Sequence, residues 1–242
     1  MAKKEQHCDR TNPKDDRCGD HWDHVAIDPE HRLVLSVIPG RRTADHCQFL
    51  VEDFHRRTGG RLMNLLTTDE YPAYTGAILE VYGQVVQPER QGDCGRFPKP
   101  YKVPPKDLVY ATVHKTRENN RVVAVDTRLI FGTEAALKRA LKRSAVSDAV
   151  NTVFVERQNG TDRNRNARKV RKTYCFSKDW DMHEAVTYFT TYSANFCWPV
   201  RTLRQQIGPE HYDPRTPAMA AGLTDHIWTL KEWLSYPAVQ RK

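Results

Sequence analysis

A strand, an acidic residue and a helix follow one another without a break in the first third of the chain. Residues 61–69, RLMNLLTTD, have the short apolar run of a buried strand that ends at Asp69. Residues 71–83, YPAYTGAILEVYG, predict a helix that stops at Gly83. Since α/β folds gather their chemistry at the carboxyl ends of such strands, this order predicts an α/β fold with Asp69 as a candidate functional residue.

The elements before this unit fit the same class. Residues 24–40 predict two strands joined by a tight turn at Asp28-Pro29, because Asp starts turns through its side chain and Pro fixes the next φ. Thr43 then begins a helix with apolar residues at helical spacing, which stops at Gly59-Gly60. The sequence therefore predicts a hairpin and a helix ahead of the Asp69 strand.

The rest of the chain divides by composition. Residues 1–20 are a polar tail, residues 84–87 predict a short strand, and residues 91–105 have the Pro, Gly and Lys content of a linker. Residues 107–116 and 121–131 predict a second hairpin, and residues 133–144 a basic amphipathic helix. We expect a core of residues 21–89 and 148–200, a hairpin-plus-helix insertion at 90–147, and a carboxy-terminal extension at 201–242. The aromatic helix at residues 180–198 should pack in the core rather than stack on bases, and a closing helix should start at Asp225.

A dense basic run follows Glu156. From Glu156 to Lys172 the chain has seven Lys or Arg residues and two acids, within a protein of net charge +8. Such a localised excess is typical of a surface that holds a polyanion. If the run is helical, Glu156 shares a face with Asn159, Arg163 and Ala167, and the next face carries Arg157, Arg165, Arg168 and Lys172. A charged surface helix is the alternative, and Asn159-Gly160 is a turn signal at its start.

Compartment and metal signals are sparse. No apolar run approaches the roughly 18 residues of a spanning helix, and the start has no signal-peptide core, so we expect a cytoplasmic protein. A nucleic-acid partner of the basic run would make it nucleoid-associated. Six cysteines are scattered without a CxxC pair, which is typical of reduced thiols. Cys8, Cys18, His21 and His24 match no common zinc spacing.

Several ordered blocks carry a resemblance. VERQN, the Arg-rich run and FSK resemble the third-carboxylate region of DDE transposases of bacterial insertion sequences, of the type named after insertion sequence one. AIDPEHRLVLSVIPGRRT, LTTDEYPAY, NFCWPVRTL and TPAMAAGLTDHIW resemble further blocks of that family in the same order. The resemblance therefore covers most of the chain.

The resemblance implies an RNase H-like mixed sheet flanked by helices, and DNA cleavage and strand transfer with two Mg²⁺ or Mn²⁺ ions. It assigns metal binding and catalysis to Asp69 and Glu156, although relatives often have Gly where Glu70 stands. The partner would be double-stranded DNA, both at the transposon ends and at the target. The protein would not bind a membrane, and it would act as a homodimer or higher oligomer. The DNA-binding set would be Arg157, Asn159, Arg163, Arg165, Arg168, Lys169, Arg171 and Lys172.

The first carboxylate of the family has no clear match. In the family it lies on an opening strand with a DE-x-W motif, which is missing here, so the resemblance implies an amino-terminally truncated chain. By its position, Asp28 could replace this first carboxylate, but its role in the turn is enough to explain why an Asp stands there. Asp20 and Asp23 are weaker candidates for the same carboxylate. Three hypotheses follow: a transposase catalytic domain, an inactive remnant that still binds DNA, and a basic α/β protein without a catalytic site.

Overall fold

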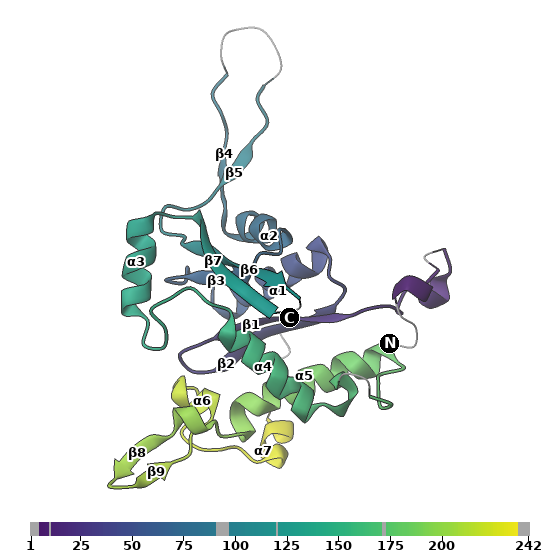
Figure 1. Cartoon of the computed structure of the whole chain (residues 1–242), viewed down its shortest axis with the longest axis vertical. Helices are drawn as coiled ribbons and strands as arrows, with labels where there is room; N and C mark the ends of the chain where they lie inside the picture. The colour runs from purple at the N-terminus through teal and green to yellow at the C-terminus, as the bar shows by residue number, and fades with distance from the viewer. Residues whose placement is uncertain (1–4, 10, 91–96, 120, 171–172, 237–242) are drawn as a thin grey trace. The chain divides into compact units, whose positions relative to one another are not determined.

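The chain folds into two compact units. The computed structural model describes residues 5–9, 11–90, 97–119, 121–170 and 173–236. One unit comprises Met1–Arg41 with Phe154–Lys242, and the other comprises Arg42–Val153. Helices and short strands occur in both (Figure 1), which confirms the mixed α/β class. Among the described residues the strands form four small sheets rather than a single one.

The central sheet of unit 42–153 has three strands. β3 (Leu66–Asp69) pairs in parallel with β6 (Tyr110–Glu118), and β6 pairs antiparallel with β7 (Arg121–Phe131). The second hairpin is therefore confirmed, but it is the sheet partner of the Asp69 strand and not part of a separate insertion. β3 was expected to be buried, and instead its residues alternate between half-buried and exposed, because it lies at an edge with one neighbour. β7 forms the other edge.

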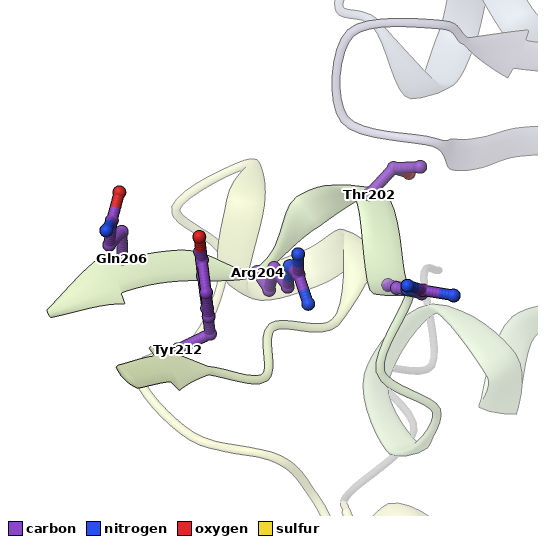
Figure 2. Close-up of a pocket in the computed structure, with 5 residues that line it drawn as sticks. Thr202, Arg204, Gln206 and Tyr212 are labelled. Atoms are coloured by element: carbon purple, nitrogen blue, oxygen red, sulfur yellow. The ribbon is translucent and has the colours of Figure 1, made fainter. Parts of the chain in front are cut away.

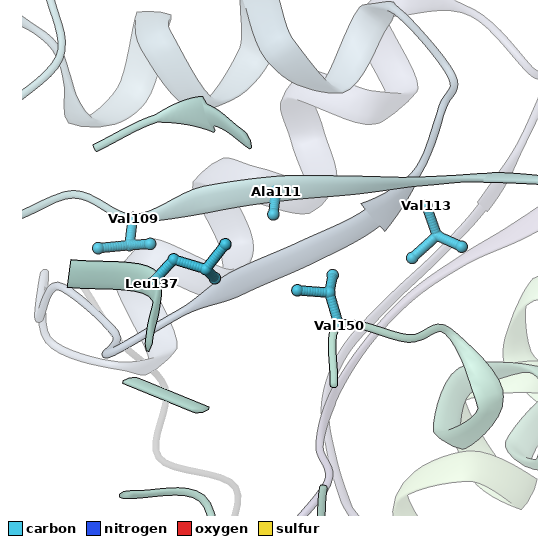
Figure 3. Close-up of a cluster of buried hydrophobic side chains, with 5 residues drawn as sticks. All are labelled: Val109, Ala111, Val113, Leu137 and Val150. Atoms are coloured by element: carbon cyan, nitrogen blue, oxygen red, sulfur yellow. The ribbon is translucent and has the colours of Figure 1, made fainter. Parts of the chain in front are cut away.

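One apolar cluster holds this sheet against α3 (Glu134–Arg143). Val109, Ala111 and Val113 of the β6 segment contact Leu137 of α3 and Val150, as Figure 3 shows. α3 begins where the Thr133 hydroxyl accepts a hydrogen bond from the Ala136 amide at 3.2 Å. This burial fixes β6, and β6 in turn fixes β3.

Two helices and a short hairpin complete unit 42–153. α1 (Ala44–Arg57) and α2 (Ala73–Tyr82) pack on each other, and both end near the predicted glycines. A Cβ at Gly83 would lie 2.2 Å from the Leu79 carbonyl oxygen, which explains the glycine at the end of α2. β4 (Gln84–Val86) pairs with β5 (Tyr101–Val103). Part of the expected linker is therefore a strand, whereas residues 91–96 lie outside the described residues.

The other unit is built on the first predicted hairpin. β1 (Trp22–Asp28) pairs antiparallel with β2 (Leu33–Gly40), and α5 (Trp180–Cys197) packs on β2. Val34 and Val37 are buried in this contact. The Tyr192 hydroxyl accepts a hydrogen bond from the Val37 amide at 3.3 Å. Tyr192 therefore packs against the strand, whereas two other aromatic residues predicted to pack in the core, Phe189 and Trp198, are 38% and 49% exposed.

Short elements close this unit. They are β8 (Gln205–Gly208), β9 (His211–Asp213), α6 (Pro217–Ala220) and α7 (Leu230–Ser235). α7 starts five residues later than predicted from Asp225, because Thr229 and Glu232 form a capping box around its first turn. Phe196 packs on Trp228 with ring centroids 4.8 Å apart, and Phe189 packs on Trp233 at 5.4 Å.

The amino-terminal segment has local structure that its composition did not predict. It contains the 3-10 helices η1 (Glu5–His7) and η2 (Pro13–Asp15), and the buried Asp15 carboxylate accepts a hydrogen bond from the Asp9 amide at 2.9 Å. Five cysteines within the described residues are free thiols, and Cys94 lies outside them. None of the helices in the described ranges is long and apolar enough to cross a membrane.

Candidate nucleic-acid interface

The segment after Glu156 is helical. α4 (Val153–Arg165) runs through Asn159-Gly160 without a break, and none of its residues is buried. Glu156, Asn159 and Arg163 therefore share a face as predicted. Ala167 does not extend that face, because Asn166 caps a separate 3-10 helix, η3 (Ala167–Lys169). Glu156, Arg157 and Arg163 are exposed.

Lys169 holds the end of this segment to β1. Its ammonium group lies 2.6 Å from the Asp162 carboxylate of α4 and 2.9 Å from the Asp23 carboxylate of β1. Only 7% of the Lys169 side chain is exposed. Burial raises the pKa of Asp162, and the charge of Lys169 opposes that rise. Lys169 was predicted to contact DNA, but the structure occupies it with two carboxylates.

A second attachment lies at the start of α4 and brings two cations together. Arg32, in the turn between β1 and β2, places its guanidinium 4.2 Å from the centre of the Phe154 ring. Burial and then the positive charge of Arg157 lower the pKa of Arg32. Arg32 Nη1 is buried without a hydrogen-bond partner among the described residues. A phosphate oxygen could supply that partner and offset the repulsion between the two guanidinium groups.

The other predicted cations differ in availability. Arg165 lies 5.6 Å above the Trp198 ring, and burial lowers its pKa. Arg168 is half-buried in η3, whereas Arg171 and Lys172 lie outside the described residues. The described basic surface therefore consists of Arg157 and Arg163, with Arg32 and Arg165 beside them. Sequence reasoning missed Arg32, since it lies in a turn far from the basic run.

Asp69 lies at the carboxyl end of β3, as predicted, in unit 42–153. Its side chain is 61% exposed, and the Arg42 guanidinium lies 3.9 Å from it. Arg42 also stacks over the Tyr71 ring at 4.5 Å. The neighbouring Glu70 is bound by Arg128 at 2.5 Å and by His114, so its carboxylate is occupied within the sheet.

Asp28 acts as a turn residue. One carboxylate oxygen accepts hydrogen bonds from the Glu30 amide at 2.8 Å and the His31 amide at 3.4 Å. The other oxygen lies 2.5 Å from the His31 ring nitrogen. Both oxygens are therefore used within the turn, which is the role favoured from the sequence. Asp23, a weaker substitute, is the partner of Lys169.

The carboxylates do not form a complete metal site within the described parts of the chain. No group of three or more His, Cys, Asp or Glu residues there could hold a metal ion, and this includes Cys8, Cys18, His21 and His24. Asp69 and Glu156 belong to different units, and each is placed only within its own. No chemical step is therefore derived through a metal.

Comparison with protein-family models, with curated proteins and with solved structures finds no match to this chain.

Proposed function

We propose that this chain binds double-stranded DNA through the exposed basic face of α4, in a protein that cleaves DNA and transfers strands like an insertion-sequence transposase. The observation that carries the proposal is the Nη1 atom of Arg32, which is buried without a hydrogen-bond partner among the described residues while the same guanidinium lies 4.2 Å from the ring of Phe154 on α4. An isolated surface helix gains nothing from holding two cations together, whereas a phosphate between them would stabilise both.

The composition of α4 supports this partner. None of the residues of this helix is fully buried, and its exposed residues include the cations Arg157 and Arg163. Its exposed cations carry no base-reading pattern, and phosphate contacts position a protein without selecting sequence. We therefore propose duplex binding with little sequence preference.

The enzymatic part of the proposal rests on Asp69 and Glu156. Both are exposed, Asp69 is the last residue of β3, and both match motifs of the transposase family. The RNase H-like arrangement, Mg²⁺ or Mn²⁺ as cofactor and a homodimer or higher oligomer are parts of the same proposal. The alternative is an inactive remnant that binds DNA, favoured by the turn role of Asp28, which leaves the first carboxylate unassigned.

Binding is tested by the salt dependence of duplex affinity. Each phosphate contact contributes about 0.9 to the slope of log K against log salt, so Arg157→Gln with Arg163→Gln should lower the slope by nearly 2. Arg139→Gln with Arg143→Gln is the matched control, since it removes two cations from the exposed face of α3. An equal loss in both double variants would show a net-charge effect and contradict the role of α4.

Cleavage is tested on a supercoiled plasmid with Mg²⁺ or Mn²⁺. If the enzymatic proposal is right, nicking should require metal and disappear in Asp69→Asn and in Glu156→Gln, while Asp107→Asn, an exposed control, should keep it. Duplex binding without any metal-dependent nicking would favour the remnant.

A further inference from the structure

A basic pocket lies in the segment that follows α5, and none of its lining residues was predicted from the sequence to be a site residue. It has a volume of about 550 Å³ and is lined by Arg201, Thr202, Arg204, Gln206 and Tyr212 (Figure 2). The lining contains two guanidinium groups and no carboxylate. Its chemistry is therefore that of a site for an anion.

Strand geometry explains why three of these side chains meet. Gln206 of β8 is directly paired with Tyr212 of β9, so both side chains project from one face of the hairpin. Arg204 lies two residues before Gln206, which places it on that face too. Its guanidinium lies 3.9 Å from the centre of the Tyr212 ring. The acid Asp213 follows Tyr212 and so projects from the other face.

The pocket is anchored at its base. The Val200 amide donates to the Arg215 carbonyl at 2.9 Å, which closes the segment that contains the hairpin. Arg215 in turn donates to the Met219 carbonyl at 2.9 Å, and Thr216 beside it is fully buried at the start of α6. These contacts fix the two ends of the segment that carries the pocket residues.

The cations of the pocket have no carboxylate partners. Within the described parts of the chain neither Arg201 nor Arg204 takes part in an ion pair, and both are exposed. The Tyr212 ring holds the Arg204 guanidinium in place and leaves its N–H groups for a ligand. Thr202 and Gln206 add hydroxyl and amide groups at the rim. All five lining residues are exposed, so the pocket is an open surface site that a phosphate group can reach directly.

We propose that this pocket binds the phosphate group of a nucleotide unit, held by Arg201 and by the Arg204 guanidinium stacked on Tyr212. The unit can belong to a nucleic-acid strand or to a free nucleotide, because both present the same phosphate. The pocket shares no residue with α4, and the inference goes beyond the proposed function.

The test compares pocket variants with the α4 variant on two probes. A fluorescent single-stranded oligonucleotide reports strand binding by anisotropy, and adenosine monophosphate reports nucleotide binding by calorimetry. If the ligand is a strand, Arg201→Gln with Arg204→Gln should lower the slope of log K against log salt by about 1.4, at about 0.7 per phosphate. If the ligand is a free nucleotide, the same double variant should abolish the heat of nucleotide binding. Arg139→Gln with Arg143→Gln should change neither.

Tyr212 separates a site from a general charge effect. Tyr212→Ala should weaken the same binding about two- to fivefold, whereas Tyr212→Phe should keep it, because the ring holds Arg204. Pocket variants that bind both probes like the unaltered chain, or that lose no more than the α3 control, would overturn the proposal. A loss in Arg157→Gln with Arg163→Gln alone would support α4 and overturn the pocket. A loss of binding in the pocket variants alone would support the pocket and show that α4 does not bind these two probes.

Discussion

The side-chain amide of Asn195 makes both hydrogen bonds to the main chain of Val34. Asn195 Nδ2 donates to the Val34 carbonyl at 2.8 Å, and Asn195 Oδ1 accepts from the Val34 amide at 3.1 Å, with both residues buried. α5 is thereby fixed to β2 by a pair of bonds that only an amide side chain supplies.

Replacing this amide should destabilise the unit strongly. Asn195→Leu leaves the donor and the acceptor of Val34 buried and unpaired, at a cost of about 1–3 kcal/mol for each group. Urea unfolding followed by tryptophan fluorescence measures the change. Asn164→Leu, at an exposed position of α4, is the control and should change stability little. Equal midpoints for the two variants would contradict the role of Asn195.

Lys169→Met should also destabilise the fold. It removes the cation between Asp23 and Asp162, and breaking a buried ion pair typically costs about 3–5 kcal/mol. We expect the lower end of that range, since 22% of the Asp23 side chain is exposed. Lys178→Met, at an exposed site, is the control. A chain that loses duplex affinity with Lys169→Met but keeps its unfolding midpoint would return Lys169 to the DNA-binding set.

His183 should make the protein sensitive to acid. Burial lowers the pKa of His183 to about 4 from 6.5, while the nearby Asp23 raises it and Lys169 and His21 lower it. Between these values the unfolded chain binds more protons than the folded chain, so stability rises with pH and falls on acidification. In His183→Gln the loss of melting temperature between neutral pH and pH about 4 should be smaller. An unchanged loss would rule out His183 as its cause.

His226 should act in the opposite direction. Its ring nitrogens lie 2.6 Å from the Asp225 carboxylate and 2.8 Å from the Glu232 carboxylate, and the hydrogen bonds to Asp225 and then Glu232 raise its pKa. The contribution of protonated His226 to folding stability is therefore complete below pH 6.5, its ordinary pKa. It is lost as the pH rises through the raised pKa of the folded state. An NMR titration of the His226 ring should show a lower pKa in Glu232→Gln than in the unaltered chain. Glu80→Gln, on α2, should leave that titration unchanged.

Asp28→Asn should be well tolerated. The amide keeps an oxygen for the Glu30 and His31 main chain and loses only the ion pair with His31, so the cost should be below about 1 kcal/mol. Asp28→Ala removes the acceptor too and should cost about 1 kcal/mol more. Metal-dependent nicking that Asp28→Asn abolishes, without a change in unfolding, would identify Asp28 as the missing carboxylate.

Local patterns predicted much of this fold. The period of apolar residues and the stop signals at Gly59-Gly60 and Gly83 defined α1 and α2, and Asp28-Pro29 defined the first turn. The parallel pairing of β3 with β6 was missed, because a parallel partner leaves no local signal in either strand. The role of Lys169 was missed for a similar reason, since its partner Asp23 is distant in sequence. The β8–β9 hairpin was also missed, although Gly208-Pro209 is a local turn signal between its two strands.

The outer strand of the three-stranded sheet has a consequence for handling the protein. β7 is eleven residues long, and Val122, Val123 and Val125 on it are exposed. An edge strand with exposed apolar side chains is a template for pairing with another chain, and charged residues along it oppose that pairing. Asp126 and Arg128 are the charges in the middle of this strand. Any self-association in concentrated samples should therefore begin at β7, and these two charges oppose it.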